Sequence, residues 1–381
     1  ALLSLFFCAP VSSWAVSPEM DRHLQTALDA VYTMRFADAE AAVQLAIAAD
    51  PEHPFGYFGM AVVSMIQYVY GTEQSDPKLL TDFDRRLDLA IDRAQTWTDK
   101  HPQDTDGYMA LGAAYGMSAR LMIFRHQWLK AYWRGRKGVA YLNRALKLDP
   151  ASLDPYSGLG MYDYYSDTYS RFVRVFAKLV LRGDRKRGVA ELRRAAAGGR
   201  YSQVLAKLIL MEVFVEDAYG MRDPEEAARL IAEVQARYPN SAMIEAIGLV
   251  ASYEGKRFPQ LLKDVAGFKA KAQNGEYDTV QLVKGYVIEG TALWAMNRRN
   301  EALSVLKTAA ETRVGGQPTR WSVWARIRAG QILDLMGERA AAVDEYRAAA
   351  ELPDLWNLRQ YAEDGLHRRW NSAYPGPIAP L

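Results

Sequence analysis

Residues 286–309 read YVIEGTALWAMNRRNEALSVLKTA, and residues 326–349 repeat this layout as RIRAGQILDLMGERAAAVDEYRAA. In each copy a glycine, Gly290 or Gly330, stands twelve residues before an alanine, Ala302 or Ala342. This distance leaves room for two helices joined by a short turn. Apolar or small residues follow each alanine after four and then three more positions, a spacing that places all of them on one helical face. The two stretches therefore predict a repeated helix–turn–helix unit.

Both halves of this unit recur along the chain. The motif of the second helix begins at Ala39, Ala90, Gly138, Gly188, Ala227, Ala302 and Ala342. In four copies a proline follows five residues after the last motif residue: Pro51, Pro102, Pro150 and Pro239. Because proline disrupts a helix interior, we expect the helix to end before it. The motif of the first helix carries a glycine that costs about 1 kcal/mol relative to alanine inside a helix. Because this glycine recurs, we expect a neighbouring helix to approach it too closely for a side chain. Its copies are Gly59, Gly112, Gly160 and Gly248, with degraded copies at Gly290 and Gly330.

Taken together, the two motifs resemble those of tetratricopeptide repeats, which are helix–turn–helix units of about 34 residues. The resemblance implies an all-α fold, a right-handed superhelical solenoid of about eight helix pairs over residues 21–353. Longer spacings between motifs predict enlarged pairs within residues 53–200. A helix over residues 354–370 should cap the last apolar face. The tail over residues 371–381, with three prolines, should be disordered.

The middle of the chain, from Tyr108 to Tyr201, is similar to a narrower group. Its segments HQWLKAYWRGRKGVAYLNRALKLDP, GLGMYDYY and GDRKRGVAELRRAA resemble bacterial tetratricopeptide proteins that are distantly related to the eukaryotic inclusion-body-clearance family. The resemblance implies an all-α interaction protein. It brings no catalytic residue and no cofactor with it.

The first fifteen residues, Ala1 to Ala15, are apolar and end in small residues suited to signal peptidase, Ser13 and Ala15. We interpret residues 1–15 as the remainder of a signal peptide and expect cleavage near Ala15, which predicts an extracytoplasmic, periplasmic protein. An uncleaved membrane anchor and a lipid-modified Cys8 are the alternatives. Cys8 is the only cysteine, so no internal disulfide can form.

Charge is unevenly distributed. Between Arg120 and Arg200 there are 18 Lys/Arg and 6 Asp/Glu residues, a net charge of +12, which leaves 29 basic and 39 acidic residues, a net charge of −10, for the remainder of the 47 and 45. Such a region suits an acidic partner or an anionic membrane, and two basic amphipathic helices are predicted over residues 120–137 and 171–182. Alternatively, their apolar faces pack on the repeats and the cations are only solvated. Binding of the basic region to nucleic acid is not expected for an exported protein. The predicted basic surface comprises Arg125, Lys130, Arg134, Arg136, Arg171, Arg174, Lys178 and Arg182.

A solenoid of helix pairs curves, and its first helices line a concave surface suited to peptides or helices. The leading hypothesis is therefore a non-enzymatic scaffold that holds an unidentified protein partner in this groove. A peripheral membrane protein docked through the basic helices is the second hypothesis. Counting around the motif glycines predicts a groove lined by Tyr57, Met60, Met109, Met161, Tyr164, Lys284, Trp294, Arg328 and Gln331.

An enzyme or small-ligand site is the third hypothesis, and it rests on Asp163 and Asp167, four apart on one helical face. The tyrosines and arginines around them favour a structural role instead. The five histidines have no metal-ligand spacing, and we find neither a phosphate-binding loop nor a nucleophile elbow. We therefore expect no catalytic residues, no metal site and no cofactor.

Overall fold

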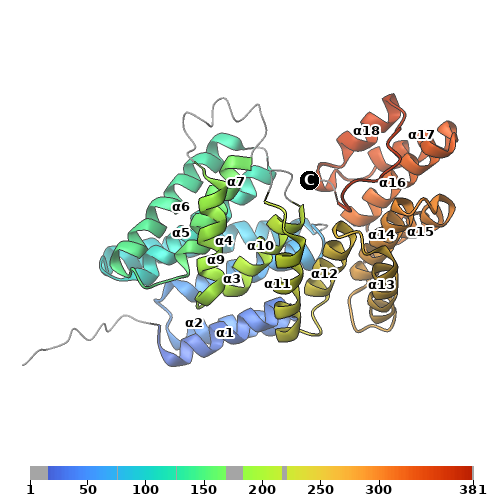
Figure 1. Cartoon of the computed structure of the whole chain (residues 1–381). Helices are drawn as coiled ribbons and strands as arrows, with labels where there is room; N and C mark the ends of the chain where they lie inside the picture. Colours follow the sequence, from blue (N-terminus) through green and yellow to red (C-terminus); the bar gives the residue numbers. More distant parts are fainter. Residues whose placement is uncertain (1–15, 75, 126, 169–182, 217–220, 380–381) are drawn as a thin grey trace, which may run out of the picture.

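The structure, a computed structural model, describes residues 16–379 apart from 75, 126, 169–182 and 217–220. These residues form an all-α solenoid of consecutive helix pairs (Figure 1). The eight pairs within the described part are α1 (Pro18–Tyr32) with α2 (Phe36–Ala49), α3 (Pro54–Ile66) with α4 (Pro77–Lys100), α5 (Thr105–Phe124) with α6 (Trp128–Leu148), α7 (Pro155–Thr168) with α9 (Arg185–Gly198), α10 (Gln203–Glu216) with α11 (Pro224–Arg237), α12 (Ala242–Glu254) with α13 (Phe258–Gln273), α14 (Thr279–Ala295) with α15 (Arg299–Glu311), and α16 (Arg320–Met336) with α17 (Arg339–Ala350).

Local sequence signals explain where the helices begin and end. Aspartates cap several N-termini with their side chains, as Asp104 does for α5 and Asp184 for α9; such caps satisfy backbone N–H groups that have no partner inside the helix. The four motif prolines each stand two residues beyond the end of a second helix: α2, α4, α6 and α11. The inference that these prolines follow helix ends is confirmed.

The motif glycines lie where two helices touch. A Cβ on Gly160 would come within 2.7 Å of the Gly188 carbonyl oxygen and 2.9 Å of the Leu192 nitrogen, both in α9. A Cβ on Gly112 would come within 2.6 Å of the Leu142 side chain in α6. These positions confirm that glycine recurs because the facing helix leaves no space for a side chain.

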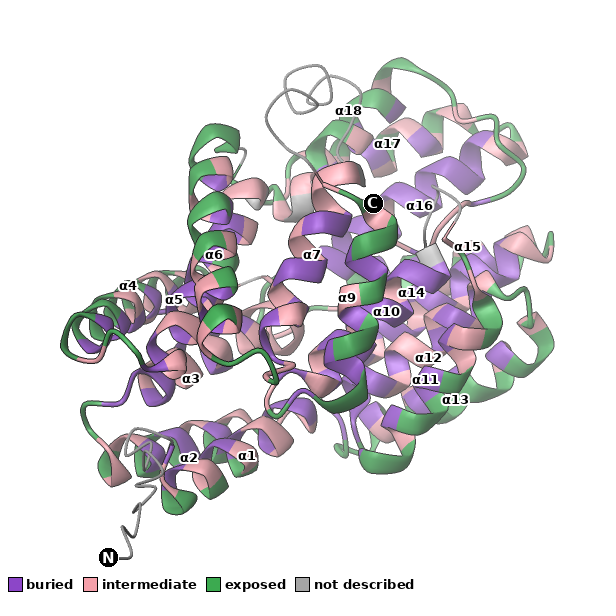
Figure 2. Cartoon of the chain, turned by 60° about the vertical axis from the view of Figure 1, so that its left-hand side comes forward, coloured by how far each residue is buried: buried purple, intermediate pink, exposed green. Residues whose placement is uncertain are grey.

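The first helices of successive pairs line the inner side of the solenoid. Each contacts the next, in the order α1, α3, α5, α7, α10, α12, α14 and α16, while no contact of similar extent joins successive second helices in the described part. Closer spacing on one side makes that side concave. Toward the C-terminal end, α14 and α16 are accordingly buried over much of their surfaces (Figure 2).

The superhelix turns far enough for its beginning to contact its middle. Asp21 of α1 accepts a hydrogen bond from the Tyr201 hydroxyl at 2.5 Å, and Asp29 accepts one from the Tyr238 hydroxyl at 2.7 Å. The Ser241 hydroxyl donates to the Tyr32 carbonyl at 2.5 Å. The first pair is therefore tied to the turns that precede α10 and α12.

The prediction of a single basic helix over residues 120–137 is wrong. The chain leaves α5 after Phe124 and enters α6 at Trp128, and the Gln127 N–H donates to the Met122 carbonyl across this turn at 2.8 Å. The basic residues belong to two antiparallel helices, because the apolar residues of this stretch are divided between the two helices of one pair. The second basic helix, predicted over residues 171–182, lies outside the described residues.

The C-terminal region also differs from the expectation. Instead of one helix over residues 354–370, a 3₁₀ turn (Leu355–Asn357) precedes the short helix α18 (Arg359–His367). The tail is not disordered over residues 371–379, where it returns across the inner side of the last pairs (Figure 1). Its composition is that of a flexible segment, but buried donors on the solenoid satisfy its backbone carbonyls.

Within the described part of the chain, none of the helices combines the length and the apolar character needed to cross a membrane.

Candidate functional site

The structure brings four predicted groove residues together on the inner side of the last two pairs. Lys284 and Trp294 come from α14, and Arg328 and Gln331 come from α16. All four are buried. Two distant segments of the same chain cover this surface, which we call the inner face of α14 and α16.

The first covering segment is the C-terminal tail, and the inner face recognises its backbone. Indole, guanidinium and phenol donors bind five of its carbonyl oxygens, which are groups that every peptide offers whatever its side chains. The hydrogen bonds run from Trp294 Nε1 to Ala373 O (2.9 Å), from Arg328 Nη1 to Pro375 O (2.6 Å), from Tyr253 Oη to Gly376 O (2.6 Å), from Arg328 Nη2 to Pro377 O, and from Trp324 Nε1 to Ile378 O (2.7 Å).

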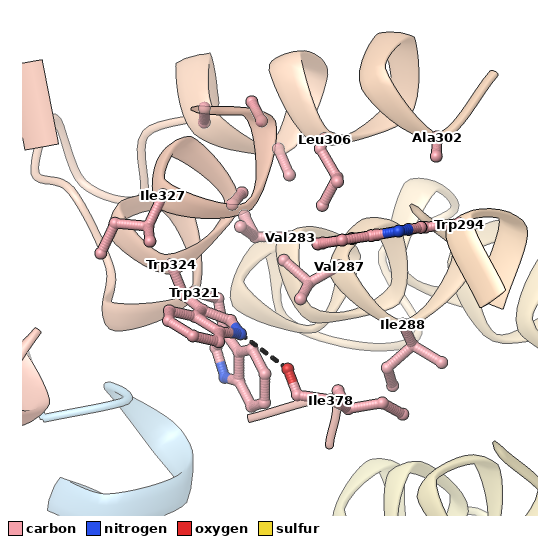
Figure 3. Close-up of a cluster of buried hydrophobic side chains, with 14 of the residues drawn as sticks. Val283, Val287, Ile288, Trp294, Ala302, Leu306, Trp321, Trp324, Ile327 and Ile378 are labelled. Atoms are coloured by element: carbon pink, nitrogen blue, oxygen red, sulfur yellow. Dashed lines mark hydrogen bonds between the residues drawn. The ribbon is translucent and has the colours of Figure 1, made fainter. Parts of the chain in front are cut away.

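Two apolar side chains anchor the tail. Ile378 is 2% exposed and packs in the same cluster as Trp321 and Trp324, and Figure 3 shows the indole of Trp324 directed at the Ile378 carbonyl. Pro375 is buried as well. Proline has no N–H group, so burying it leaves no donor without a partner. The sequence YPGPI thus presents carbonyls and apolar surface to this face with few backbone donors to satisfy.

Arg328 is the central donor of the inner face. Its guanidinium lies 4.4 Å from the ring centroid of Trp324 and 5.4 Å from that of Trp294, in cation–π contact with both. Gln331 Oε1 accepts a hydrogen bond from Arg328 Nη1 at 3.0 Å and so holds the side chain in place. Burial lowers the pKa of Arg328 to about 10, which leaves the guanidinium charged at neutral pH.

The second covering segment is the loop between the π-helical turn Gln67–Gly71 and α4. Its residue Glu73 has no exposed surface and forms ion pairs with Lys284 Nζ at 2.5 Å and with Arg320 at 2.6 Å. Burial acts to raise the pKa of the Glu73 carboxyl, but Arg320 and Lys284 outweigh it and hold the pKa below its ordinary value. Glu73 is therefore charged over the whole neutral range.

Sequence reasoning missed Glu73, Arg320, Trp324 and Tyr253. Trp324 lies four residues before Arg328 on α16, so the helical period that selected Arg328 could also have selected Trp324. Nothing in the spacing of the chain indicates that Glu73 meets residues more than 200 positions away. That contact depends on the curvature of the whole solenoid.

The groove residues predicted on α3 are placed differently. The Tyr57 hydroxyl donates to the Pro51 carbonyl at 2.8 Å, and the Tyr57 ring lies under the guanidinium of Arg93 from α4. Met60 accepts a hydrogen bond from Gln44 of α2 and packs against the core of the first pair. Both side chains thus contact second helices. Met60 follows a motif glycine that itself packs on α2, and successive residues are only about 100° apart on a helix.

The predicted groove residues of α5 and α7 also separate. Met109 lines a cavity together with Val16, Phe55 and Tyr201, so the residues just before α1 border the same cavity. Met161 is half-buried and packs against the core of the middle pairs. Tyr164 is buried against α9, because it lies one turn after Gly160 on the face that packs there. Tyr164 is a core residue and its assignment to the groove is wrong.

The described part of the basic surface is divided. Arg125 donates two hydrogen bonds to Asp84 of α4, at 2.7 and 3.2 Å. Arg134 packs over the ring of Tyr115. Lys130 and Arg136 are exposed at the start of α6, beside the exposed side chains of Trp128, Leu129 (71%) and Trp133 (62%). The remaining four basic residues, Arg171, Arg174, Lys178 and Arg182, lie outside the described residues.

Asp163 and Asp167 each pair with an arginine of α9. Asp163 accepts two hydrogen bonds from Arg187, and Asp167 lies 2.6 Å from Arg185 Nε. Glu191 is next to Asp163; burial and the charge of Asp163 raise its pKa to about 7. The two aspartates therefore join α7 to α9. The described residues contain no group of three or more histidine, cysteine or acidic side chains placed to hold a metal ion.

No protein-family model matches the sequence, and no curated protein matches it either. Among solved structures, yeast Tom70 is similar over 92% of this chain and 88% of its own, at 11% identity and a TM-score of 0.44. A tetratricopeptide repeat protein from Parabacteroides merdae is similar over 77% of this chain and 93% of its own, at 12% identity and a TM-score of 0.33. The tetratricopeptide domain of P58(IPK) is similar over 91% of this chain and 96% of its own, at 12% identity and a TM-score of 0.20.

Those likenesses concern the fold alone. The internal geometry of the chain carries the assignment of the repeat type: paired helices, glycine at the closest approach within each pair, proline after the second helix, and first helices on the inner side. The chain is an all-α solenoid of tetratricopeptide-type helix pairs.

Proposed function

We propose that the chain is a non-enzymatic scaffold that binds a non-helical peptide segment of a partner protein on the inner face of α14 and α16. The observation that carries this proposal is the tail itself, a segment whose carbonyls are bound by side chains of three first helices, α12, α14 and α16. A surface that holds one such segment in cis has the donors to hold another in trans.

The partner segment that we propose has the chemistry of the bound tail. The segment should present free carbonyls, an aliphatic side chain in the place of Ile378, and prolines that reduce the number of N–H groups to be buried. Gly376 has a φ of +77°, a left-handed conformation that favours glycine, so a Pro-Gly-Pro-aliphatic sequence fits best. Binding of this kind depends on hydrogen bonds to the backbone and on a few apolar side chains, rather than on a long series of side-chain contacts.

The test uses the full-length chain with the tail expelled by Ile378→Lys, which would place a lysine among Trp321, Trp324 and Arg328. The probe is a fluorescein-labelled peptide of residues 371–379. In the wild-type chain the tail competes at an effective concentration on the order of millimolar. The Ile378→Lys chain should therefore bind the peptide at least tenfold more tightly, as measured by fluorescence anisotropy.

Two controls accompany this measurement. Adding Arg328→Met to the Ile378→Lys chain removes the central donor and should abolish binding, while circular dichroism confirms that the helices remain. A peptide that carries lysine in place of its isoleucine should not bind. Equal binding of the labelled peptide to wild-type and Ile378→Lys chains would contradict the proposal.

A second candidate function, docking on an anionic membrane, rests on the exposed start of α6. Trp128, Leu129 and Trp133 are exposed there beside Lys130 and Arg136, a combination typical of interfacial helices. Flotation with vesicles containing 30% phosphatidylserine tests it. Replacing Lys130 and Arg136 by glutamine should reduce binding at low salt; identical flotation with neutral vesicles would rule this function out.

The proposed location is extracytoplasmic, and it rests on the apolar residues 1–15 and the small residues before Val16. The mass of the mature protein, purified from cells that express its natural gene, tests this point. Export and processing predict a chain that begins near Val16, whereas an unprocessed cytosolic chain would remove the location from the proposal.

A further inference from the structure

Beside the tail, the inner face carries a second site, formed by Lys284 and Arg320. Lys284 lies on α14, and Arg320 is the first residue of α16, where the helix N-terminus adds partial positive charge. Both side chains are at least nine-tenths buried, and both lie within 6 Å of the Trp321 ring centroid. Two cations and a helix N-terminus in one buried place form a pocket that requires a negatively charged occupant.

In this structure Glu73 is the occupant, and it comes from the second helix pair. Its carboxylate oxygens divide between the two cations, Oε1 to Lys284 and Oε2 to Arg320. Glu73 and the following Gln74 have φ values of +49° and +61°, a left-handed conformation that side-chain-bearing residues rarely adopt. The loop therefore adopts an unfavourable backbone conformation to deliver the carboxylate.

The pocket lies in line with the path of the tail. The tail runs antiparallel to α16, from the Trp370 N–H bound to Asp334 near the end of the helix to the Ile378 carbonyl bound to Trp324 near its start. Arg320 is four residues before Trp324, about 6 Å along the axis at 1.5 Å per residue. A peptide that continues past the Ile378 position would cover that distance with two or three residues at about 3.3 Å each.

We propose that Lys284 and Arg320 form a carboxylate subsite of the inner face, which takes an acidic side chain of the partner segment in place of Glu73. The acidic residue stands two or three positions after the aliphatic residue that fills the Ile378 position. Glu73 is the occupant in cis, as the tail is for the neighbouring carbonyl-binding site. This inference rests on the proposed function, since it specifies the partner for the same face.

The experiment compares two amidated, fluorescein-labelled peptides: residues 371–379 followed by Gly-Glu, which places the glutamate three positions after Ile378, and the same peptide ending in Gly-Gln. Amidation removes the terminal carboxylate, so only the side chain differs. The proteins are the full-length Ile378→Lys chain and the full-length Ile378→Lys/Glu73→Gln chain. The Glu peptide should bind the double variant at least tenfold more tightly than the Gln peptide, and the two should bind equally where Glu73 is present.

The control adds Lys284→Met to the double variant and should remove the preference for the Glu peptide while leaving the Gln peptide bound. Equal binding of both peptides to the double variant overturns the carboxylate subsite and leaves the proposed function standing. Failure of both peptides on all proteins overturns the proposed function instead. The two failures are therefore distinguishable.

A second measurement covers the case in which Glu73→Gln unfolds the chain in the Ile378→Lys background. In the otherwise wild-type full-length chain, Glu73→Ala vacates the pocket, and sodium acetate is the probe. Acetate should raise the melting temperature of Glu73→Ala saturably, by several degrees more than that of the wild type, while equal concentrations of sodium chloride or acetamide should not. An equal effect of acetate on both chains overturns the subsite.

Discussion

At the scale of single residues, Glu191 is the carboxyl with the most informative titration. It lies half-buried on α9 beside Asp163, and burial together with that neighbouring charge raises its pKa to about 7, from an ordinary value of 4.5. Because the folded pKa is higher than the unfolded one, the folded chain gains stability from the neutral carboxyl below pH 4.5. This contribution is lost as the pH rises through 7.

We expect Glu191→Gln to stabilise the chain at pH 8 and to leave its stability nearly unchanged at pH 5. The difference between the folded and the ordinary pKa corresponds to about 3 kcal/mol, which solvent screening at this half-exposed group reduces to about 1 kcal/mol. Urea unfolding at the two pH values measures the difference. The control is Glu363→Gln on the exposed side of α18. A gain that is the same at both pH values would contradict the assigned titration.

At the scale of helices, the fold depends on how closely two helices approach. In the pair α7 and α9, the glycines Gly160 and Gly188 face each other, and a Cβ on either would lie 2.7 Å from the carbonyl of the other. Backbone atoms cannot rotate away as a flexible side chain can. Adding a single methyl group must therefore separate the two helices.

We predict that Gly160→Ala destabilises the chain by about 1–3 kcal/mol, the usual cost of overpacking. The matched control is Gly267→Ala in α13, where an added Cβ meets no atom within 4 Å. Alanine is the better helix former, so Gly267→Ala should stabilise by about 0.5–1 kcal/mol. Thermal unfolding followed by circular dichroism compares the two. If both substitutions change the melting temperature in the same direction, the close approach of α7 and α9 is wrong.

At the scale of the whole molecule, the solenoid is held by contacts that cross many repeats. Repeat arrays usually depend on contacts between neighbouring units. Here Glu73 from the second pair is bound by Lys284 and Arg320 from the seventh and eighth, and α1 is bound by the turns before α10 and α12. We therefore expect the chain to unfold more cooperatively than an open array.

Glu73→Gln should destabilise the chain by about 3–5 kcal/mol at pH 7, because it removes the carboxylate that the buried side chains of Lys284 and Arg320 bind. The folded pKa of Glu73 is lowered, so its contribution is complete above the ordinary value of about 4.5 and is lost as the pH falls through the folded pKa. The difference between wild type and variant should thus shrink below about pH 4.5.

The control for this prediction is Glu52→Gln, which removes an exposed partner of Lys100 and should cost less than about 1 kcal/mol. Guanidinium unfolding at pH 7 and pH 4 measures both variants. A Glu73→Gln chain as stable as the Glu52→Gln chain at pH 7 would show that the contact between the distant pairs does not support the fold.

The candidate site was predictable only in part. Lys284, Trp294, Arg328 and Gln331 follow from the helical period counted from Gly290 and Gly330, and they do share one face. The same count failed for Tyr164. A helix surface is continuous, and the sequence does not show which side faces the neighbouring second helix and which faces inward.

By itself, the sequence determined the helix pairs, their glycine contacts and their proline ends, because each depends on residues a few turns or one repeat apart. Spacing of that kind is preserved in the order of residues. Only the tertiary structure decided that Glu73 and residues 371–379 cover the inner face. Those contacts join positions that come together because the curvature of many repeats adds up. The curvature depends on small rotations at each helix pair, which side-chain packing sets. These rotations leave no periodic pattern in the sequence.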